Sequence, residues 1–276
     1  MQLVVPPDTW DIREPAAVER LVAAQELDII LHLAAQSYVP HSFIDPRLTF
    51  DVNLMGTLNL LVALKRSGFD GRLLYVSSAD VYGRVSDAEL PIDEGTPARP
   101  VSPYASSKLA AEQLCLQWCR SESLDVVIAR PFNHIGPGQH EKFVVPALAR
   151  QVVNIALGKQ PPVIETGDLD TTRDFTDIRD VVAAYADLIL TGKSGQTYVI
   201  ATGIERRIRD ILGVMCEKMC IAPEVRQEAS RMRPGEQRRI AGNATKLRKE
   251  TGWQPAHSFA QSIGDVLQEV IRNHEQ

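Results

Sequence analysis

The sequence predicts an α/β fold in which a parallel sheet carries helices on both faces, followed by a smaller C-terminal lobe. Short apolar strand-like runs alternate with longer helix-like segments in the first half of the chain, and such alternation is typical of parallel sheets. After Pro131 the pattern gives way to loops that contain glycine and proline, with helical segments between them. We therefore expect a sheet domain over residues 1–135, with parts of 165–200, and a lobe formed mainly by residues 136–276.

Each expected element has its own signal. Apolar runs predict strands over residues 2–5, 28–33, 72–77 and 125–129. Helical spacing predicts helices over residues 15–25, 46–67, 103–121, 143–157, 178–190, 208–219 and 259–272. Proline suits the first turn of a helix and glycine suits its end. Pro15, Pro46 and Gly68 therefore support the bounds of the first two helices.

Composition and charge exclude several classes of protein. The chain has 276 residues, of which 44% are hydrophobic, and its net charge is −5. No sequence-wide basic footprint for nucleic acid exists, no apolar run is long enough to cross a bilayer, and no secretory signal precedes the first strand. We expect a cytoplasmic enzyme without nucleic-acid or membrane partners. The four cysteines stand two by two at a spacing of four residues, Cys115 with Cys119 and Cys216 with Cys220. This helical spacing predicts reduced cysteines that pack in the fold and no metal site.

Three polar side chains predict the chemistry. Tyr104 and Lys108 stand four apart in Tyr-Ala-Ser-Ser-Lys, so they share one face of the expected helix. Ser78 follows the strand 72–77, and open α/β sheets hold their active sites beyond the carboxyl ends of strands. A cation near the Tyr104 phenol is expected to lower the phenol pKa, and a hydroxyl can hold the oxygen that receives the proton. This trio is suited to interconverting an alcohol and a ketone, although Tyr-x-x-x-Lys alone also occurs on ordinary surface helices.

An expected glycine-rich loop is missing from the sequence. A dinucleotide-binding sheet usually opens with a strand, a glycine-rich turn and a helix whose N-terminus receives the pyrophosphate. Here the first glycine is Gly56, inside a helix-like segment. We expect the chain to begin at the second strand of such a sheet, without about thirty residues that would form one strand–helix step.

Several segments together resemble one family. Residues 31–36 (Leu-His-Leu-Ala-Ala-Gln), Asn53 with residues 56–60, and residues 76–83 with Tyr104 and Lys108 resemble the extended short-chain dehydrogenase/reductases of the nucleotide-sugar epimerase and dehydratase group, from about residue 11 to about residue 255. Residues 130–139, 173–177 and 231–239 resemble its GDP-4-dehydro-6-deoxy-D-mannose reductases, which make GDP-D-rhamnose.

The resemblance implies a Rossmann-type doubly wound parallel sheet, truncated at its N-terminus, with a smaller substrate-binding lobe. It implies NADP or NAD as cofactor, a GDP-sugar substrate and a homodimer. The implied catalytic residues are Ser78, Tyr104 and Lys108. The implied cofactor-binding residues are Asp11, Ile12, Leu33, Ala34, Ala35, Tyr104, Lys108 and Pro131. The implied substrate-binding residues are Gln36, Asp80, Asn133, Arg173, Arg233 and Glu236.

Structural alternatives stand beside several of these roles. Asp11 also suits the charge at a helix start, Ala34 and Ala35 also suit tight helix–sheet packing, and Asn133 also suits a turn. Arg173, Arg233 and Glu236 can equally belong to surface ion pairs, although arginine forks suit a diphosphate.

Asp80 bears on the type of reaction. The related dehydratases carry a glutamate two positions after the serine or threonine, and here the acid is one methylene shorter, which favours simple reduction of the keto group. Two alternatives stay open. The first is another nucleotide-sugar epimerase or dehydratase. The second is a truncated, catalytically silent protein that binds nucleotide sugars.

Overall fold

The computed structural model describes residues 3–7, 9–228 and 237–275. Its residues group into two compact units. Unit 1 contains residues 1–84, 94–131 and 185–198, and unit 2 contains residues 85–93, 132–184 and 199–276. The main chain enters unit 2 at residue 85 and returns to unit 1 at residue 94. It enters unit 2 again after Pro131, whereas the sequence predicts a boundary after residue 135.

Unit 1 is built on a sheet with the strand order β1-β2-β3-β7. Its strands are β1 (Ile29–His32), β2 (Arg72–Val76), β3 (Asp125–Pro131) and β7 (Thr197–Ile200), the last of which continues into unit 2. The pairs β1–β2 and β2–β3 are parallel, with Ile30 opposite Leu73 and Leu74 opposite Val127. The predicted parallel α/β arrangement is confirmed.

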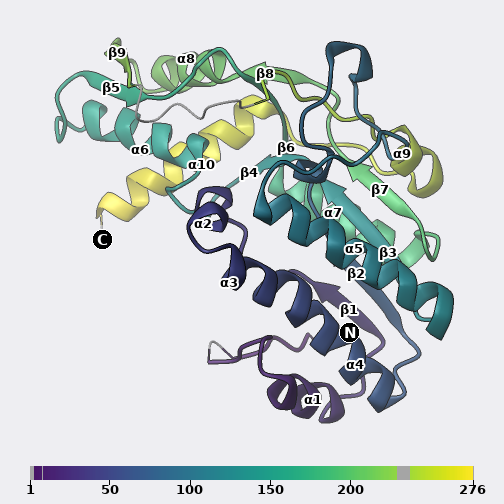
Figure 1. The fold of residues 1–276 in the computed structure, drawn as a ribbon. Helices are drawn as coiled ribbons and strands as arrows, with labels where there is room; N and C mark the ends of the chain where they lie inside the picture. Colours follow the sequence, from purple (N-terminus) through teal and green to yellow (C-terminus); the bar gives the residue numbers. More distant parts are fainter. Residues whose placement is uncertain (1–2, 8, 229–236, 276) are drawn as a thin grey trace. The chain divides into compact units, whose positions relative to one another are not determined.

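Helices cover both faces of this sheet, as the near-continuous apolar strands require. One face carries α1 (Pro15–Ala23), α4 (Gly56–Ser67) and α5 (Pro103–Glu122), which pack on Leu73, Tyr75, Val126 and Ile128 (Figure 1). On the other face, Val127 lies against Gly192, directly after α7 (Ile178–Thr191). Arg72 ties the start of β2 to the end of α7 through the carbonyls of Leu188 and Ile189, at 3.2 and 2.9 Å.

Two predicted elements of unit 1 are wrong in part. Leu3–Val5 does not form a strand. A strand exists only where a neighbour supplies hydrogen bonds, and Leu3 and Val5 are instead 85% and 70% exposed. The single helix expected over residues 46–67 consists of α3 (Pro46–Phe50), a π-helical turn η1 (Asp51–Met55) and α4. A further short helix, α2 (Val39–Ile44), precedes them.

Unit 2 contains two small sheets. In the first, β4 (Asn133–Ile135) pairs in parallel with β6 (Thr172–Asp177), which pairs antiparallel with β8 (Glu205–Arg207). In the second, β5 (Val163–Thr166) pairs in parallel with β9 (Glu224–Gln227). The buried Asp174 carboxylate on β6 accepts hydrogen bonds from the backbone N–H groups of Thr202, Gly203 and Gly242, so one side chain joins three segments of this unit.

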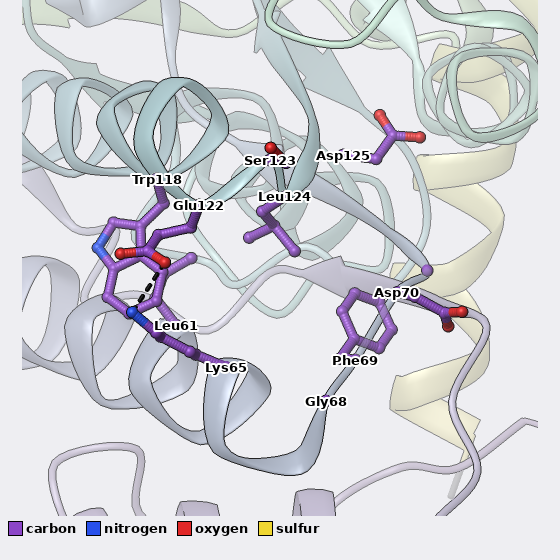
Figure 2. A pocket seen from close by; sticks show the side chains of 11 residues that line it. Leu61, Lys65, Gly68, Phe69, Asp70, Trp118, Glu122, Ser123, Leu124 and Asp125 are labelled. Carbon is purple, nitrogen blue, oxygen red and sulfur yellow. Dashed lines mark ion pairs between the residues drawn. The ribbon is translucent and has the colours of Figure 1, made fainter.

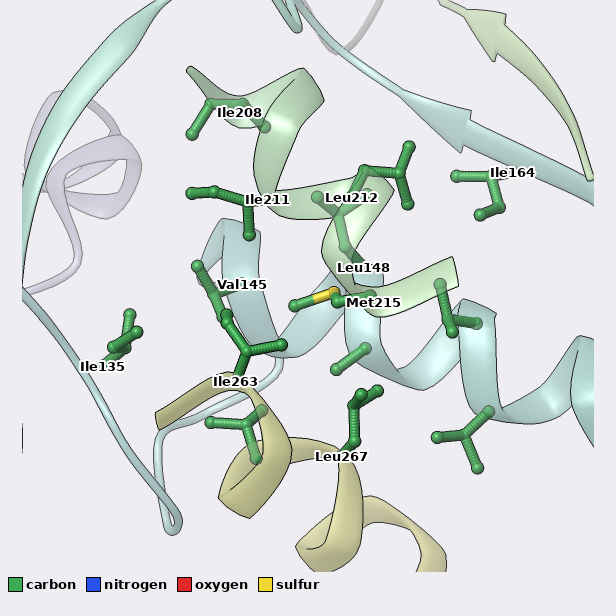
Figure 3. Packing of buried hydrophobic residues seen from close by; sticks show 14 of the residues in the cluster. Ile135, Val145, Leu148, Ile164, Ile208, Ile211, Leu212, Met215, Ile263 and Leu267 are labelled. Carbon is green, nitrogen blue, oxygen red and sulfur yellow. The ribbon is translucent and has the colours of Figure 1, made fainter. Parts of the chain in front are cut away.

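The apolar core of unit 2 lies between three helices, α6 (Val144–Ala156), α8 (Ile208–Lys218) and α10 (Phe259–Glu275). Leu148, Met215 and Ile263 come from one helix each and point into the same space (Figure 3). The remaining helix, α9 (Thr245–Thr251), ends at Gly252 in the left-handed conformation. No helix in the described residues is long and apolar enough to span a membrane.

We expect Leu148→Ala to lower the free energy of unfolding by about 3 kcal/mol, because it leaves a cavity between three helices. Leu148 is 2% exposed, whereas Leu157, just after the same helix, is 46% exposed. Leu157→Ala is therefore the matched control, with an expected change within about 0.5 kcal/mol. Urea unfolding followed by circular dichroism measures both, and equal losses in the two variants would contradict this packing.

Candidate active site

Ser78 is positioned by the end of β2. The strand is followed by a 3₁₀ turn, η2 (Ala79–Tyr82), and the Ser78 hydroxyl caps this turn by accepting a hydrogen bond from the Asp80 N–H at 3.1 Å. Gly83 ends the turn with φ 63°, and a Cβ at this position would lie 1.8 Å from the Arg99 carbonyl oxygen. Only glycine allows this close approach of two backbone segments.

Tyr104 and Lys108 are positioned by the start of α5. The Ser102 hydroxyl accepts a hydrogen bond from the Ala105 N–H at 3.1 Å, and Pro103 occupies the first helical turn. This combination of cap and proline fixes where the helix begins. Tyr104 therefore lies in the first turn and Lys108 one turn later, on the buried face, where they are 8% and 3% exposed.

The phenol of Tyr104 is kept protonated. Burial raises its pKa above the usual value, the negative charge of Asp80 raises it further, and hydrogen bonding with Ser78 opposes the rise. The expected lowering of this pKa by Lys108 is not found, because the Lys108 ammonium lies over the ring of Tyr75, 4.7 Å from its centroid. A protonated phenol beside a serine hydroxyl is a proton donor.

The charge of the buried Lys108 is subject to two opposing effects, burial and a nearby carboxylate. Burial lowers its pKa to about 8, although the nearby carboxylate of Glu112 acts in the opposite direction. No hydrogen bond from its ammonium to another side chain or carbonyl occurs within the described part of the chain. Its three N–H donors are therefore free to bind a ligand or to stabilise a tyrosinate.

A buried polar chain runs beneath these residues. The Thr57 hydroxyl donates to the Asn53 carbonyl at 2.7 Å, so it must accept the 2.9 Å hydrogen bond from His32 Nε2. His32 is thereby fixed as the neutral tautomer with its proton on Nε2. Burial, together with the positive charge of Lys108, lowers the His32 pKa to about 3, so this ring stays neutral.

Asn53 connects this chain to the helix of Tyr104. Its side chain bonds both backbone groups of Gln36, at 2.8 and 3.1 Å, and donates to the Ser107 hydroxyl at 2.9 Å. Ser107 in turn donates to the Tyr104 carbonyl at 2.8 Å. The π-helical turn η1 carries Asn53, and such turns occur frequently at functional sites. Asn53 is not among the site residues predicted from the sequence. The only sequence signal for Asn53 is that its segment resembles the central helix of the family.

The sequence profile of the GDP-mannose 4,6 dehydratase family matches residues 8–266. The chain belongs to this family. It is 45% identical to the GDP-6-deoxy-D-mannose reductase of Pseudomonas aeruginosa over 95% of this chain and 86% of that protein. It is also 32% identical to a dTDP-glucose 4,6-dehydratase of Mycolicibacterium smegmatis, over 93% of this chain and 75% of the relative.

Solved structures agree with this membership. A structure of RMD from Pseudomonas aeruginosa in complex with NADPH matches with a TM-score of 0.94 and 43% identity, over 99% of this chain and 90% of that one. The Thermus thermophilus UDP-glucose 4-epimerase in complex with NAD matches with a TM-score of 0.84 and 31% identity, over 95% and 83%. The resemblance and the Rossmann-type fold class predicted from the sequence are confirmed. These relatives are reductases, dehydratases and epimerases of nucleotide sugars, which is the enzyme class that the sequence predicts.

The predicted cofactor residues of this family member lie in different environments. Leu33 is exposed and Ala34 and Ala35 are half-buried, directly after β1. Asp11 is engaged by its neighbour, since the Arg13 side chain and N–H both bond its carboxylate and lower its pKa. The following residue, Ile12, is buried and packs on Gly56. Pro131 is buried as the last residue of β3.

The predicted substrate residues are distributed over both units. In unit 1, Asp80 is exposed, and the Gln36 side chain bonds Thr49 and the Tyr38 N–H at 3.0 and 2.7 Å. In unit 2, Asn133 is exposed at the start of β4, and half-buried Arg173 on β6 donates to the Thr172 carbonyl at 2.7 Å. The predicted residues Arg233 and Glu236 lie outside the described residues. These roles stay predictions.

A pocket of about 330 Å³ lies at the opposite ends of the strands (Figure 2). Gly71 and Asp125, at the starts of β2 and β3, line it together with the last turns of α4 and α5. An ion pair between Lys65 and Glu122, at 2.8 Å, joins these two helices there. The pocket contains none of the predicted site residues. The described residues contain no cluster of three or more side chains suited to hold a metal ion.

We expect Asn53→Leu to lower the free energy of unfolding by about 2 kcal/mol, because it leaves the backbone groups of Gln36 and the Ser107 hydroxyl without a partner. Asn59→Leu is the control, since the Asn59 side chain makes one hydrogen bond, to the Ile12 carbonyl at 3.0 Å. Its expected loss is about 1 kcal/mol or less. Urea unfolding compares the two, and an Asn53 variant no less stable than its control would show that the polar chain does not hold α5.

Proposed function

We propose that this chain reduces the 4-keto group of GDP-4-dehydro-6-deoxy-D-mannose to give GDP-D-rhamnose, which is GDP-6-deoxy-D-mannose. The observation that carries the proposal is the buried, protonated Tyr104 beside Ser78, with the free ammonium of Lys108 one helical turn away. The 45% identity to a GDP-6-deoxy-D-mannose reductase, over most of both chains, supports the choice of substrate.

In the proposed reaction the chain orients the keto group and handles one proton. A bound NADPH or NADH supplies the hydride to C4 of the sugar. Tyr104 donates its phenolic proton to the C4 oxygen as negative charge develops there, and the Ser78 hydroxyl donates a hydrogen bond to the same oxygen. For its positive charge to stabilise the resulting tyrosinate, which burial disfavours, the Lys108 ammonium moves from the ring of Tyr75 toward the Tyr104 oxygen.

The residues at the end of β1 and on α5 fit a nicotinamide cofactor. Lys108 offers a buried ammonium with unused donors, which suits the hydroxyls of the nicotinamide ribose. Ala34 and Ala35 place small side chains after β1, where a dinucleotide backbone can approach closely. Complexes of the relatives with NADPH and with NAD support both forms as candidates. Asp11 must give up its bond to Arg13 before its carboxylate can accept the adenine amino group.

Keto reduction is favoured over elimination by the acid after Ser78. Asp80 has a shorter side chain than the glutamate expected in a dehydratase, and it is close enough to Tyr104 to raise the phenol pKa. A nearby carboxylate helps to keep the proton donor protonated. The identity to dTDP-glucose 4,6-dehydratases is 32% or lower among the matches compared, below the 45% to the reductase.

We also propose that the protein forms a homodimer. Exposed apolar side chains on unit 1 support this arrangement, since α2 packs on α3 and α5 and leaves Phe43 and Ile44 61% and 79% exposed. A second copy of the same surface would cover them.

The cytoplasmic location expected from the sequence stays a prediction.

The test is to incubate the purified chain with GDP-4-dehydro-6-deoxy-D-mannose and NADPH or NADH, and separately with GDP-mannose and the oxidised cofactor. Loss of cofactor absorbance together with formation of GDP-6-deoxy-D-mannose is the expected result. Formation of a keto sugar from GDP-mannose without net consumption of cofactor would instead indicate a dehydratase. A folded protein that binds the nucleotide sugar but turns over neither substrate would contradict the proposal and favour a silent binding protein.

We expect Tyr104→Phe and Ser78→Ala each to lower kcat by about 10²-fold or more, because one removes the proton donor and the other the hydrogen bond to the C4 oxygen. Ser77→Ala is the matched control, since the Ser77 hydroxyl is buried next to Ser78 but bonds no group in the described residues. The assay above measures all three, with circular dichroism to show that each variant folds. Equal losses for Ser77→Ala and Ser78→Ala would remove Ser78 from the site.

A further inference from the structure

A buried ion pair lies one helical turn beyond Lys108. Glu112 on α5 is fully buried, and Arg130 on β3 is 7% exposed. The Arg130 guanidinium donates two hydrogen bonds to the Glu112 carboxylate, from Nε to Oε1 at 2.9 Å and from Nη2 to Oε2 at 2.6 Å. Its third nitrogen, Nη1, donates to the Tyr82 hydroxyl at 3.1 Å, and the guanidinium lies 4.9 Å from the Tyr82 ring centroid. This geometry fixes the position of the Glu112 carboxylate.

Glu112 belongs to the same face of α5 as the proposed catalytic residues. Tyr104, Lys108 and Glu112 follow one another at four-residue spacing and are all buried. Neighbours at this spacing on a helix interact directly. The carboxylate of Glu112 raises the pKa of Lys108, against the effect of burial.

Other ionisable groups also face this part of the helix. They come from α5 itself, from β1 and β2, from the turn η2 and from α7, and they are Cys115, His32, Tyr75, Asp80 and Tyr185. His32 is neutral, and burial keeps Tyr75 and Cys115 protonated at neutral pH. Asp80 raises the pKa of Tyr104, and Tyr104 in turn raises the pKa of Tyr185. Among the described residues, the carboxylate of Glu112, paired with Arg130, is therefore the acidic group that acts on Lys108.

We propose that Glu112 is a positioning residue for Lys108: clamped by Arg130, its carboxylate keeps the buried ammonium charged at the pH where the enzyme works. The arginine holds the acid in one place through its two hydrogen bonds. Only the catalytic consequence rests on the proposed function, because the charge of Lys108 can be measured without substrate. The plainer role of the pair is to join α5 to β3, and the two roles differ in what they predict for Lys108.

The decisive variant removes both charges together. Glu112→Gln alone leaves the Arg130 charge buried without a counter-ion, whereas Glu112→Leu with Arg130→Met replaces the pair by apolar groups of similar size, which buried sites often tolerate. If Glu112 supports the lysine charge, Lys108 should lose its proton at a pH about one unit lower in this double variant. A merely structural pair leaves the titration of Lys108 unchanged.

The titration is read by NMR of protein labelled with ¹³C at lysine Cε, without substrate, from about pH 6 to about pH 11, with Lys108→Arg to assign the signal. The unaltered protein should give a midpoint near the pKa of about 8. In the enzyme assay, the fall of kcat on the alkaline side should move to lower pH by the same amount. Unchanged titration in a folded double variant overturns the proposal. If the titration shifts in the double variant but the unaltered protein does not reduce the keto sugar, the role of Glu112 is supported and the proposed function is contradicted.

A second ion pair, between Lys65 on α4 and Glu122 at the end of α5, supplies the control. Lys65→Met with Glu122→Leu removes this pair, far from Lys108 along α5, and should leave the titration of Lys108 unchanged. If the first double variant does not fold, Glu112→Gln is measured in its place, because it keeps the side-chain size and an oxygen for Arg130. Its expected shift is at least as large and in the same direction, and an unshifted Lys108 signal there counts against the proposal.

Discussion

Burial of ionisable groups on one face of α5 is the constraint on which the candidate site depends. Low dielectric favours the neutral form of every group placed there. It keeps Tyr104 protonated, keeps His32 neutral and lowers the pKa of Lys108 to about 8. The nearby carboxylate of Glu112 acts against burial and favours the charged form of this lysine.

The helix can bury this face because its neighbours supply the missing hydrogen bonds. Asn53 bonds the loop after β1 and the Ser107 hydroxyl, and Arg130 bonds Glu112 from β3. Two polar side chains of α5, Ser107 and Glu112, are thus paired with the π-helical turn η1 and with β3. The edge strand β1 is less well covered. Among the described residues it pairs with β2 alone, and Leu31 within it and Leu33 directly after it are 39% and 57% exposed. Its outer backbone groups remain open to another strand.

Local patterns predicted most of the elements and failed where distant partners decide. Helical spacing predicted α5 and α10 to within a few residues, because proline, caps and apolar periodicity act over short distances. The strand expected at residues 2–5 was wrong, since no neighbouring strand pairs with Leu3–Val5. The π-helical turn around Asn53 had no local signal, because bonds to Gln36 and Ser107, distant in sequence, accompany it.

The sequence by itself determined the chemistry available at the site. The order of Ser78, Tyr104 and Lys108 along a strand end and a helix start requires only helical periodicity and parallel-sheet topology. The tertiary structure alone decided the charge state of these groups. The sequence suggested a Tyr104 pKa lowered by Lys108, whereas the folded chain raises it, because the energy of a charge depends on burial and on all groups around it, and those come from segments far apart in the sequence.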